Sequence, residues 1–235
     1  MARTDTGGTP LLIAASQGNL DGVRYLLGEA HADVNKATTD TGCTPLYIAA
    51  QNDNLDVVRY LSGEAHAAVN KARTDTGGTP LYVAAQNDNP DVARYLAGEA
   101  HADVNQAITY DGSTPLLIAA SQGNLDVVRY LIGEAHADVN QATNSGSTPL
   151  PIAAKQQGQE VSSQHGTARQ IRRGQRFLKI MKLVRILIGA EHRQARKPCE
   201  IDNNKLHDRV VRFKRALRHR EVPSIEQMRI AVLRL

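Results

Sequence analysis

The stretch TPLYIAAQNDNLDVVRYL, residues 44–61, recurs as TPLYVAAQNDNPDVARYL at residues 79–96. The Thr-Pro-Leu triplet also begins at residues 9, 114 and 148, so successive triplets lie 35, 35, 35 and 34 residues apart. A fixed period of this size is typical of an array of stacked units, because a single unit cannot bury its apolar face alone. The sequence therefore predicts four full repeats and a degenerate fifth, over residues 1–161.

The first half of each copy predicts a short helix. Thr44 is a good N-cap, and Pro45 stands at the first helical position, where its fixed φ suits a helix and its missing N–H costs nothing. The paired alanines, Ala49 and Ala50, allow another helix to approach closely. The polar residues 52–54 then break the helix.

The second half of each copy predicts another helix and a loop. Asp56 suits the positive N-terminus of a helix, and Val57, Val58 and Leu61 lie on one face of it. We expect Gly63 to end this helix. The turn residues that follow predict an extended finger that leads to the next Thr-Pro-Leu.

This order of helix, turn, helix and finger, written as TPLYIAAQNDNLDVVRYL…ADVN…DGSTPL, resembles the ankyrin repeat and its Thr-Pro-Leu-His-x-Ala signature. The resemblance implies an all-α helix-turn-helix solenoid with finger loops. It also implies protein–protein recognition rather than catalysis. The chain departs from the signature at the His, which is replaced by Leu12, Tyr47, Tyr82, Leu117 and Pro151.

By the pattern of that family, a partner protein binds the fingers and the exposed side of the first helices. The residues of this chain at those places are Thr39, Cys43, Tyr47, Gln51, Asn52, Arg73, Tyr82, Gln86, Asn87, Tyr110, Ser113, Leu117, Ser121 and Gln122. We predict that they form the surface of an interaction scaffold.

The net charge of +4 hides two chemically different halves. Residues 1–154 hold 8 Lys/Arg against 17 Asp/Glu, a charge of −9, and residues 155–235 hold 20 against 7, a charge of +13. An acidic array favours a partner of basic or mixed charge, with binding that weakens as salt increases. The basic half is itself a candidate partner for the acidic one.

The C-terminal region divides into a polar linker at 162–174 and a basic tail at 175–235, which we expect to be helical or partly disordered. Phe177, Met181 and Ile186 are candidate anchors for a calmodulin-like, helix-in-groove interaction. Nucleic acid or an anionic lipid surface would also suit the charge of the tail. A solvated helical face or a nuclear-import signal explains the same residues without a special partner.

Catalytic and metal-binding patterns are missing from the sequence. His31, His66, His101 and His136 occur once per copy, and helices that pack about 8–10 Å apart do not bring such residues to one ion with Zn–N bonds of about 2 Å. Cys43 and Cys199 form no paired spacing. We therefore expect no enzyme activity, no metal and no cofactor.

The sequence predicts an intracellular protein, cytoplasmic or nuclear. Its N-terminus shows no secretory signal, and its longest apolar stretch, at 177–188, is short and contains three basic residues. Tyr25, Tyr60, Tyr95 and Tyr130 recur in register and predict half-buried packing on the second helices.

Overall fold

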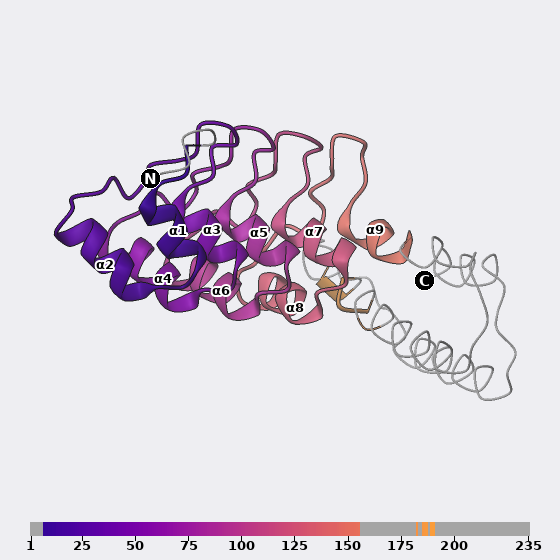
Figure 1. The fold of residues 1–235 in the computed structure, drawn as a ribbon. Coiled ribbons are helices and arrows are strands. Elements are labelled where there is room, and N and C mark those ends of the chain that lie inside the picture. Colours follow the sequence, from indigo (N-terminus) through magenta and orange to yellow (C-terminus); the bar gives the residue numbers. More distant parts are fainter. Residues whose placement is uncertain (1–6, 156–181, 183–184, 188, 191–235) are drawn as a thin grey trace, which may run out of the picture.

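In the computed structural model, helices follow one another in two parallel rows (Figure 1). The structure describes residues 7–155, 182, 185–187, 189 and 190, and among these it contains helices and loops but no strand. The first helices of the repeats form one row and the second helices form the other, with the finger loops projecting beyond the first row. This arrangement confirms the predicted all-α solenoid.

The first helices are α1 (Pro10–Ser16), α3 (Pro45–Gln51), α5 (Pro80–Gln86), α7 (Pro115–Gln122) and α9 (Pro149–Lys155). The second helices are α2 (Leu20–Gly28), α4 (Leu55–Arg59), α6 (Pro90–Arg94) and α8 (Leu125–Gly133). Helices α4 and α6 continue into the wider π-helical turns η1 (Tyr60–Glu64) and η2 (Tyr95–Glu99).

The Thr-Pro pair starts the first helices in the way that the sequence predicts. The Thr44 hydroxyl accepts a hydrogen bond from the Tyr47 N–H at 3.1 Å, and the Thr79 hydroxyl accepts one from the Tyr82 N–H at the same distance. These bonds satisfy an N–H group that has no partner within the helix, and proline fills the next position. Local sequence therefore fixes where each repeat begins.

The predicted glycine ends α2 and α8, at Gly28 and Gly133, whereas η1 and η2 run one residue further, to Glu64 and Glu99. In each of these four copies a histidine then reverses the chain. Gly63 lies inside η1, so the helix continues past it. The Ala65 N–H bonds to the Tyr60 carbonyl five residues earlier, at 2.9 Å, and the chain then reverses at His66, whose φ is +53°. His31, His101 and His136 adopt the same left-handed conformation. Each His therefore has a backbone role that usually falls to glycine or asparagine.

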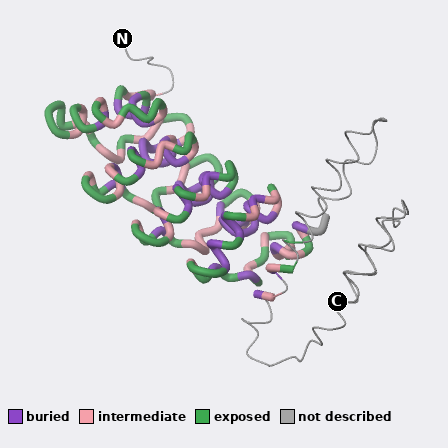
Figure 2. Tube along the Cα trace, turned by 90° about the horizontal axis from the view of Figure 1, so that it is seen from below, coloured by how far each residue is buried: buried purple, intermediate pink, exposed green. Residues whose placement is uncertain are grey.

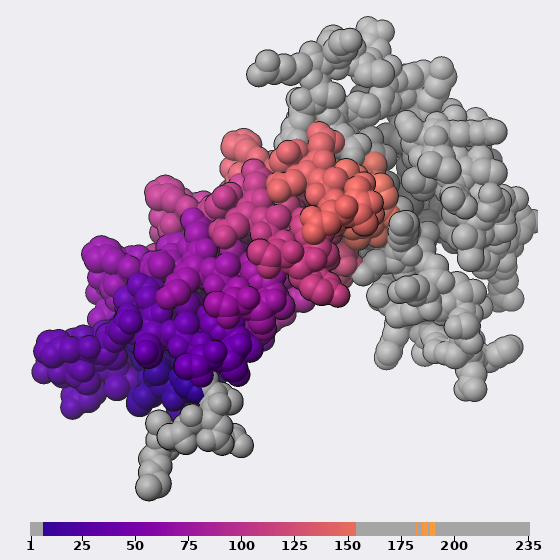
Figure 3. All heavy atoms as spheres, turned by 90° about the horizontal axis from the view of Figure 1, so that it is seen from above, coloured from indigo at the N-terminus to yellow at the C-terminus, as the bar shows by residue number. Residues whose placement is uncertain are grey.

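The core runs as one continuous layer between the two rows of helices (Figure 2). Leu46, Leu81 and Leu116 from the first helices are almost fully buried, and Leu61, Leu96 and Leu131 from the second row are fully buried. Small alanines on the first helices complete the layer. Seen from above, the repeats follow one another in chain order along an elongated body (Figure 3).

Asparagines join each repeat to the one before it. The Asn89 side-chain amide donates to the Ala50 carbonyl at 2.9 Å and to the Gln51 carbonyl at 3.3 Å, at the C-terminal end of α3. Asn54 and Asn124 make the equivalent bonds to Ala15 and Ala85, both at 2.8 Å. These three residues, which we call the asparagine ladder, donate hydrogen bonds to carbonyl groups at the C-terminal ends of first helices, where partners within the helix run out.

Arginine and tyrosine side chains connect successive second helices. The guanidinium groups of Arg24, Arg59 and Arg94 lie 5.3–5.9 Å from the ring centres of Tyr60, Tyr95 and Tyr130, each in the following repeat. The Tyr130 hydroxyl also donates to the Arg94 carbonyl at 3.1 Å. Cation–π contact within about 6 Å is attractive, so these pairs, the Arg–Tyr ladder, stabilise the stack. The predicted half-buried packing holds for Tyr60 and Tyr95, whereas Tyr130 is buried and Tyr25 is 65% exposed.

Backbone hydrogen bonds connect neighbouring fingers. The N–H groups of Thr74, Thr109 and Asn144 donate to the carbonyls of Thr41, Thr76 and Asp111 at 2.8–3.1 Å. Glycine is required where these fingers meet: Gly77 has φ +77°, and a Cβ placed on it would lie 2.5 Å from the Thr109 nitrogen. The fingers therefore form a regular edge.

Part of the C-terminal region also belongs to the core. Leu187 is fully buried, and together with Ala190 it lies in the same hydrophobic cluster as Ala153 of α9. Ile186 packs against this cluster, and Lys182 and Arg185 are exposed. The predicted linker at 162–174 lies outside the described residues.

Candidate partner-binding groove

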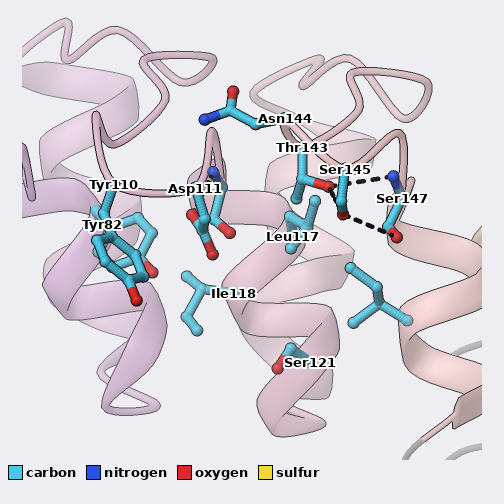
Figure 4. Close-up of a pocket in the computed structure, with 12 residues that line it drawn as sticks. Tyr82, Tyr110, Asp111, Leu117, Ile118, Ser121, Thr143, Asn144, Ser145 and Ser147 are labelled. Carbon is cyan, nitrogen blue, oxygen red and sulfur yellow. Dashed lines mark hydrogen bonds between the residues drawn. The ribbon is translucent and has the colours of Figure 1, made fainter.

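A groove of about 590 Å³ lies between the fingers and the first helices of the third, fourth and fifth copies (Figure 4). We call it the finger groove. Its floor comes from α7 and α9, its walls come from two successive fingers, and Tyr82 of α5 borders it. The lining residues are Tyr82, Tyr110, Asp111, Ser113, Leu117, Ile118, Ser121, Thr143, Asn144, Ser145, Ser147 and Ile152.

The lining combines apolar and hydrogen-bonding groups. Leu117 and Ile118 lie on the floor, and Tyr110 at a finger tip leaves 82% of its surface exposed. Across the groove, the hydroxyl groups of Thr143 and Ser145 lie 2.9 Å apart, and the Ser147 N–H donates to the Thr143 hydroxyl at 3.1 Å. A surface of this composition can hold an apolar side chain and bind an extended backbone.

Asp111 is the one charged side chain among the described residues that line the groove. Its Oδ1 accepts a hydrogen bond from the Ser113 N–H at 2.8 Å, and its backbone carbonyl accepts from Asn144. No described hydrogen bond uses Oδ2. Asp111 is therefore held in place by the fingers and keeps an acceptor for a donor on a partner.

Burial and the Asp111 carboxylate both act on Tyr82. Loss of solvent is the larger cause and the nearby negative charge adds to it, so together they raise the pKa of Tyr82 to about 12. The phenol therefore stays neutral and keeps its O–H donor at physiological pH.

The neighbouring part of the same face, one repeat earlier, is closed by an arginine. Arg73 lies 5.3 Å from the ring centre of Tyr47, and its guanidinium is bound by the Asp75 carboxylate. The corresponding position in the next finger holds Ile108, which is buried. A charged side chain therefore covers the tyrosine of the first helix in one repeat, and the next finger has an apolar residue at that position.

The Arg73–Asp75 ion pair and burial shift the pKa values of the residues around Arg73. The hydrogen bond from Arg73 lowers the pKa of Asp75. Burial raises the pKa of Cys43, against a smaller opposing effect of Arg73, and burial likewise raises the pKa of Tyr47. Cys43 is thus a thiol at neutral pH, and nothing in its surroundings activates it as a nucleophile.

The finger groove brings together a part of the predicted binding surface. The predicted residues that line it are Tyr82, Tyr110, Ser113, Leu117 and Ser121. The predicted residues that lie elsewhere on the array are Thr39, Cys43, Tyr47, Gln51, Asn52, Arg73, Gln86, Asn87 and Gln122. Tyr47, Tyr82, Ser113 and Leu117 are largely buried. Their role in binding stays a prediction.

Sequence reasoning missed the residues that come from the fifth copy. Thr143, Asn144, Ser145, Ser147 and Ile152 line the groove, yet the predicted surface stopped at the fourth copy because the fifth was treated as degenerate. The Thr148-Pro-Leu triplet carries the signal that would have found them, since it places 143–147 on a finger. Asp111 and Ile118 were missed as well.

The predicted tail anchors fall in two classes. Phe177 and Met181 lie outside the described residues. Ile186 is half-buried against the hydrophobic core of the array, so its side chain is already in use within the chain. Binding of nucleic acid, calmodulin or lipid by the tail stays a prediction.

The described residues contain neither a metal-binding cluster nor a membrane-spanning helix. Within 7–155 and the few described residues at 182–190, no group of three or more His, Cys, Asp or Glu side chains is placed to hold a metal ion. In the same part of the chain, no helix is both long and apolar enough to cross a membrane.

Comparison with known proteins gives one match. A family model described as ankyrin repeats, in three copies, matches residues 11–108 and 100–163, which together make up more than half of the chain. No curated protein matches the chain significantly.

Proposed function

The chain belongs to the ankyrin-repeat family, and on that premise we propose that it is an interaction scaffold that binds a partner protein in the finger groove. Ankyrin repeats are protein–protein interaction modules, and the family is typically not enzymatic. The observation that carries the proposal is the open groove beside Tyr110, whose ring is largely exposed at a finger tip.

The groove suits an extended segment with an apolar side chain. Tyr110 and Ile118 offer an apolar contact, and aromatic residues often dominate the binding energy of protein interfaces. The hydroxyl groups of Thr143 and Ser145 lie on the opposite wall, where they can bond to the backbone of the segment. A shallow and mixed surface of this kind fits a peptide better than a small molecule.

The charge of the groove favours a basic residue next to that apolar side chain. Asp111 supplies a carboxylate oxygen at the rim, and the array as a whole is acidic. A Lys or Arg of the partner would meet Asp111 without a competing cation, because Arg73 is held by Asp75 one finger away. We therefore expect the on-rate to fall as salt increases.

Affinity capture with the full-length chain as bait tests this function. We compare the wild type with Tyr110→Ala and Asp111→Asn, and we use Tyr25→Ala as the matched control because Tyr25 is an exposed tyrosine far from the groove. A partner of the groove should be retained by the wild type and by Tyr25→Ala. Its retention should drop about tenfold or more with Tyr110→Ala, the expected size for an interface anchor.

The Asp111→Asn variant removes the negative charge of the groove and keeps the shape of the side chain, so it measures the contribution of the charge alone. It should lower retention at low salt and leave it almost unchanged at high salt, since screening removes the same interaction. If every captured protein is retained equally by wild type, Tyr110→Ala and Asp111→Asn, the finger groove is not the binding surface.

A further inference from the structure

The basic region contains a second-helix sequence of the repeat. LVRILIGAEH at 183–192 aligns with VVRYLIGEAH at 127–136, and six of the ten positions are identical. The identical pairs include the Arg, Leu and Gly that every second helix of the array carries. A chance apolar helix would not reproduce the Gly and the His that follow the helix at the same spacing.

The structure places the described residues of this segment as the repeat requires. Leu187 is fully buried, as is its counterpart Leu131, and Arg185 is exposed, as is Arg129. Ile186 is half-buried at the position of the tyrosines. The burial pattern of a second helix is therefore present where the sequence match predicts it.

The position of the segment in the fold also fits. In Figure 1 the described residues of the segment (185–187, 189 and 190) lie next to α8, at the end of the row of second helices. Leu187 and Ala190 share a hydrophobic cluster with Ala153 of α9 and with Leu131 and Ile132 of α8. Leu131 and Ile132 are themselves buried, so the end of the array is covered.

We infer that residues 183–192 are the second helix of the fifth repeat, separated from the first helix by an insertion. In the fourth copy, 16 positions separate Pro115 from Leu131, whereas in the fifth copy 38 positions separate Pro149 from Leu187. The insertion is therefore 22 residues long and enters at the turn between the two helices. Loops on the surface accept such lengths at a small entropic cost.

This inference gives the segment two structural roles. It covers the apolar end of the array with residues of the chain itself, and terminal repeats need such a cover. It also supports α9, whose Ile152 lines the finger groove. The boundary between array and basic tail then lies after His192 rather than at 162–174.

A cleavable version of the full-length chain tests the inference. A protease recognition sequence placed between Gly166 and Thr167, inside the insertion, is cut after folding, and the two pieces are then analysed by size-exclusion chromatography. We expect them to elute together at low salt and at about 1 M NaCl, where screening acts within about 3 Å. Apolar burial of Leu187 survives high salt, but attraction between the acidic and basic halves does not.

Two variants sharpen the result. Leu187→Asp puts a charge at a fully buried position and should separate the pieces after cleavage. Leu217→Asp, in the basic region beyond the match, is the control and should leave them together. Separation of the unmodified pieces at both salt concentrations, or association at low salt alone, would overturn the inference.

Hydrogen exchange on the uncut wild-type chain gives an independent measurement that does not depend on how a variant folds. The amide of Leu187 should exchange slowly, with protection within about tenfold of that of Leu131, because both belong to one cooperative stack. Exchange of the Leu187 amide at the rate of an unfolded peptide would also overturn the inference.

Discussion

The asparagine and Arg–Tyr ladders and the finger groove are built from the same repeats but behave differently from copy to copy. The ladders use the same residue types each time, as in Asn54, Asn89 and Asn124. The residue that follows Thr-Pro-Leu lines the groove in two copies, and its identity differs between them: it is Tyr82 in the third copy and Leu117 in the fourth. Positions that join repeats are repeated, and positions that line the finger groove vary between copies.

The physical reason lies in what each position contacts. A ladder residue contacts the neighbouring repeat, so a change in one copy leaves a carbonyl of the preceding copy or a ring of the following copy without its partner. An exposed groove residue such as Tyr110 contacts solvent, so its change costs little folding energy. Stability and the proposed recognition therefore rest in part on different residues, which can be tested separately.

The largest expected effect is a loss of folding stability when a leucine of the hydrophobic core is shortened. Leu96→Ala removes a fully buried side chain from the second-helix row and should lower the free energy of unfolding by about 2–5 kcal/mol. Ser121→Ala in the groove should change it by less than about 0.5 kcal/mol. Urea unfolding of the full-length variants, followed by circular dichroism, measures both. Equal losses would show that the groove also supports the fold.

A smaller effect separates two asparagines that donate to the same carbonyl. Asn89 and Asn87 both bond to the Gln51 carbonyl, at 3.3 and 2.9 Å, but Asn89 is buried and also holds Ala50. Asn89→Ala should lower the free energy of unfolding by about 1–3 kcal/mol, because a buried carbonyl loses its donor.

The matched variant Asn87→Ala should cost less than about 0.5 kcal/mol, since water replaces the lost donor at an exposed site. The same urea experiment compares the two variants. A cost for Asn87→Ala as large as that for Asn89→Ala would contradict the assignment of the junction between repeats to the buried amide.

The smallest effect arises in the groove at high pH. Because the folded pKa of Tyr82 is raised to about 12 and that of an unfolded tyrosine is near 10, the unfolded chain loses this proton first. The contribution of Tyr82 is therefore fully present below pH 10 and is lost as the pH rises toward 12. The loss amounts to about 1 kcal/mol at pH 11.

Tyr82→Phe should remove this part of the alkaline dependence, together with the ultraviolet phenolate signal that has its midpoint near pH 12. Tyr110→Phe serves as the control because its side chain is exposed. Thermal unfolding between pH 9 and pH 11 measures the difference. An unchanged alkaline slope in Tyr82→Phe would show that Tyr82 ionises alike in the folded and unfolded chain.

The sequence predicted the repeats and their first helices well because local signals decide them. The Thr-Pro pair caps α1, α3, α5 and α7 in the structure as expected. The predicted end of the second helix holds for α2 and α8, but η1 runs one residue past Gly63 and the chain then reverses at the left-handed His66. A histidine with positive φ depends on the hydrogen bonds around it, and single-residue preferences do not reveal it.

The candidate site was predicted in part for a similar reason. Tyr82, Tyr110 and Leu117 follow from the period of the repeat, but the groove is also bordered by the fifth copy. The 35-residue period does not continue through the fifth copy, so the prediction left out the finger of that copy.

The bonds between fingers join only adjacent repeats, and this has a mechanical consequence. Pulling on the two ends of the array would load these junctions one after another, because no hydrogen bond described between fingers skips a copy. The array should therefore yield in steps of about one repeat each under tension, as expected for a stack held by nearest neighbours. Such a chain can act as a spring between whatever is attached to its ends.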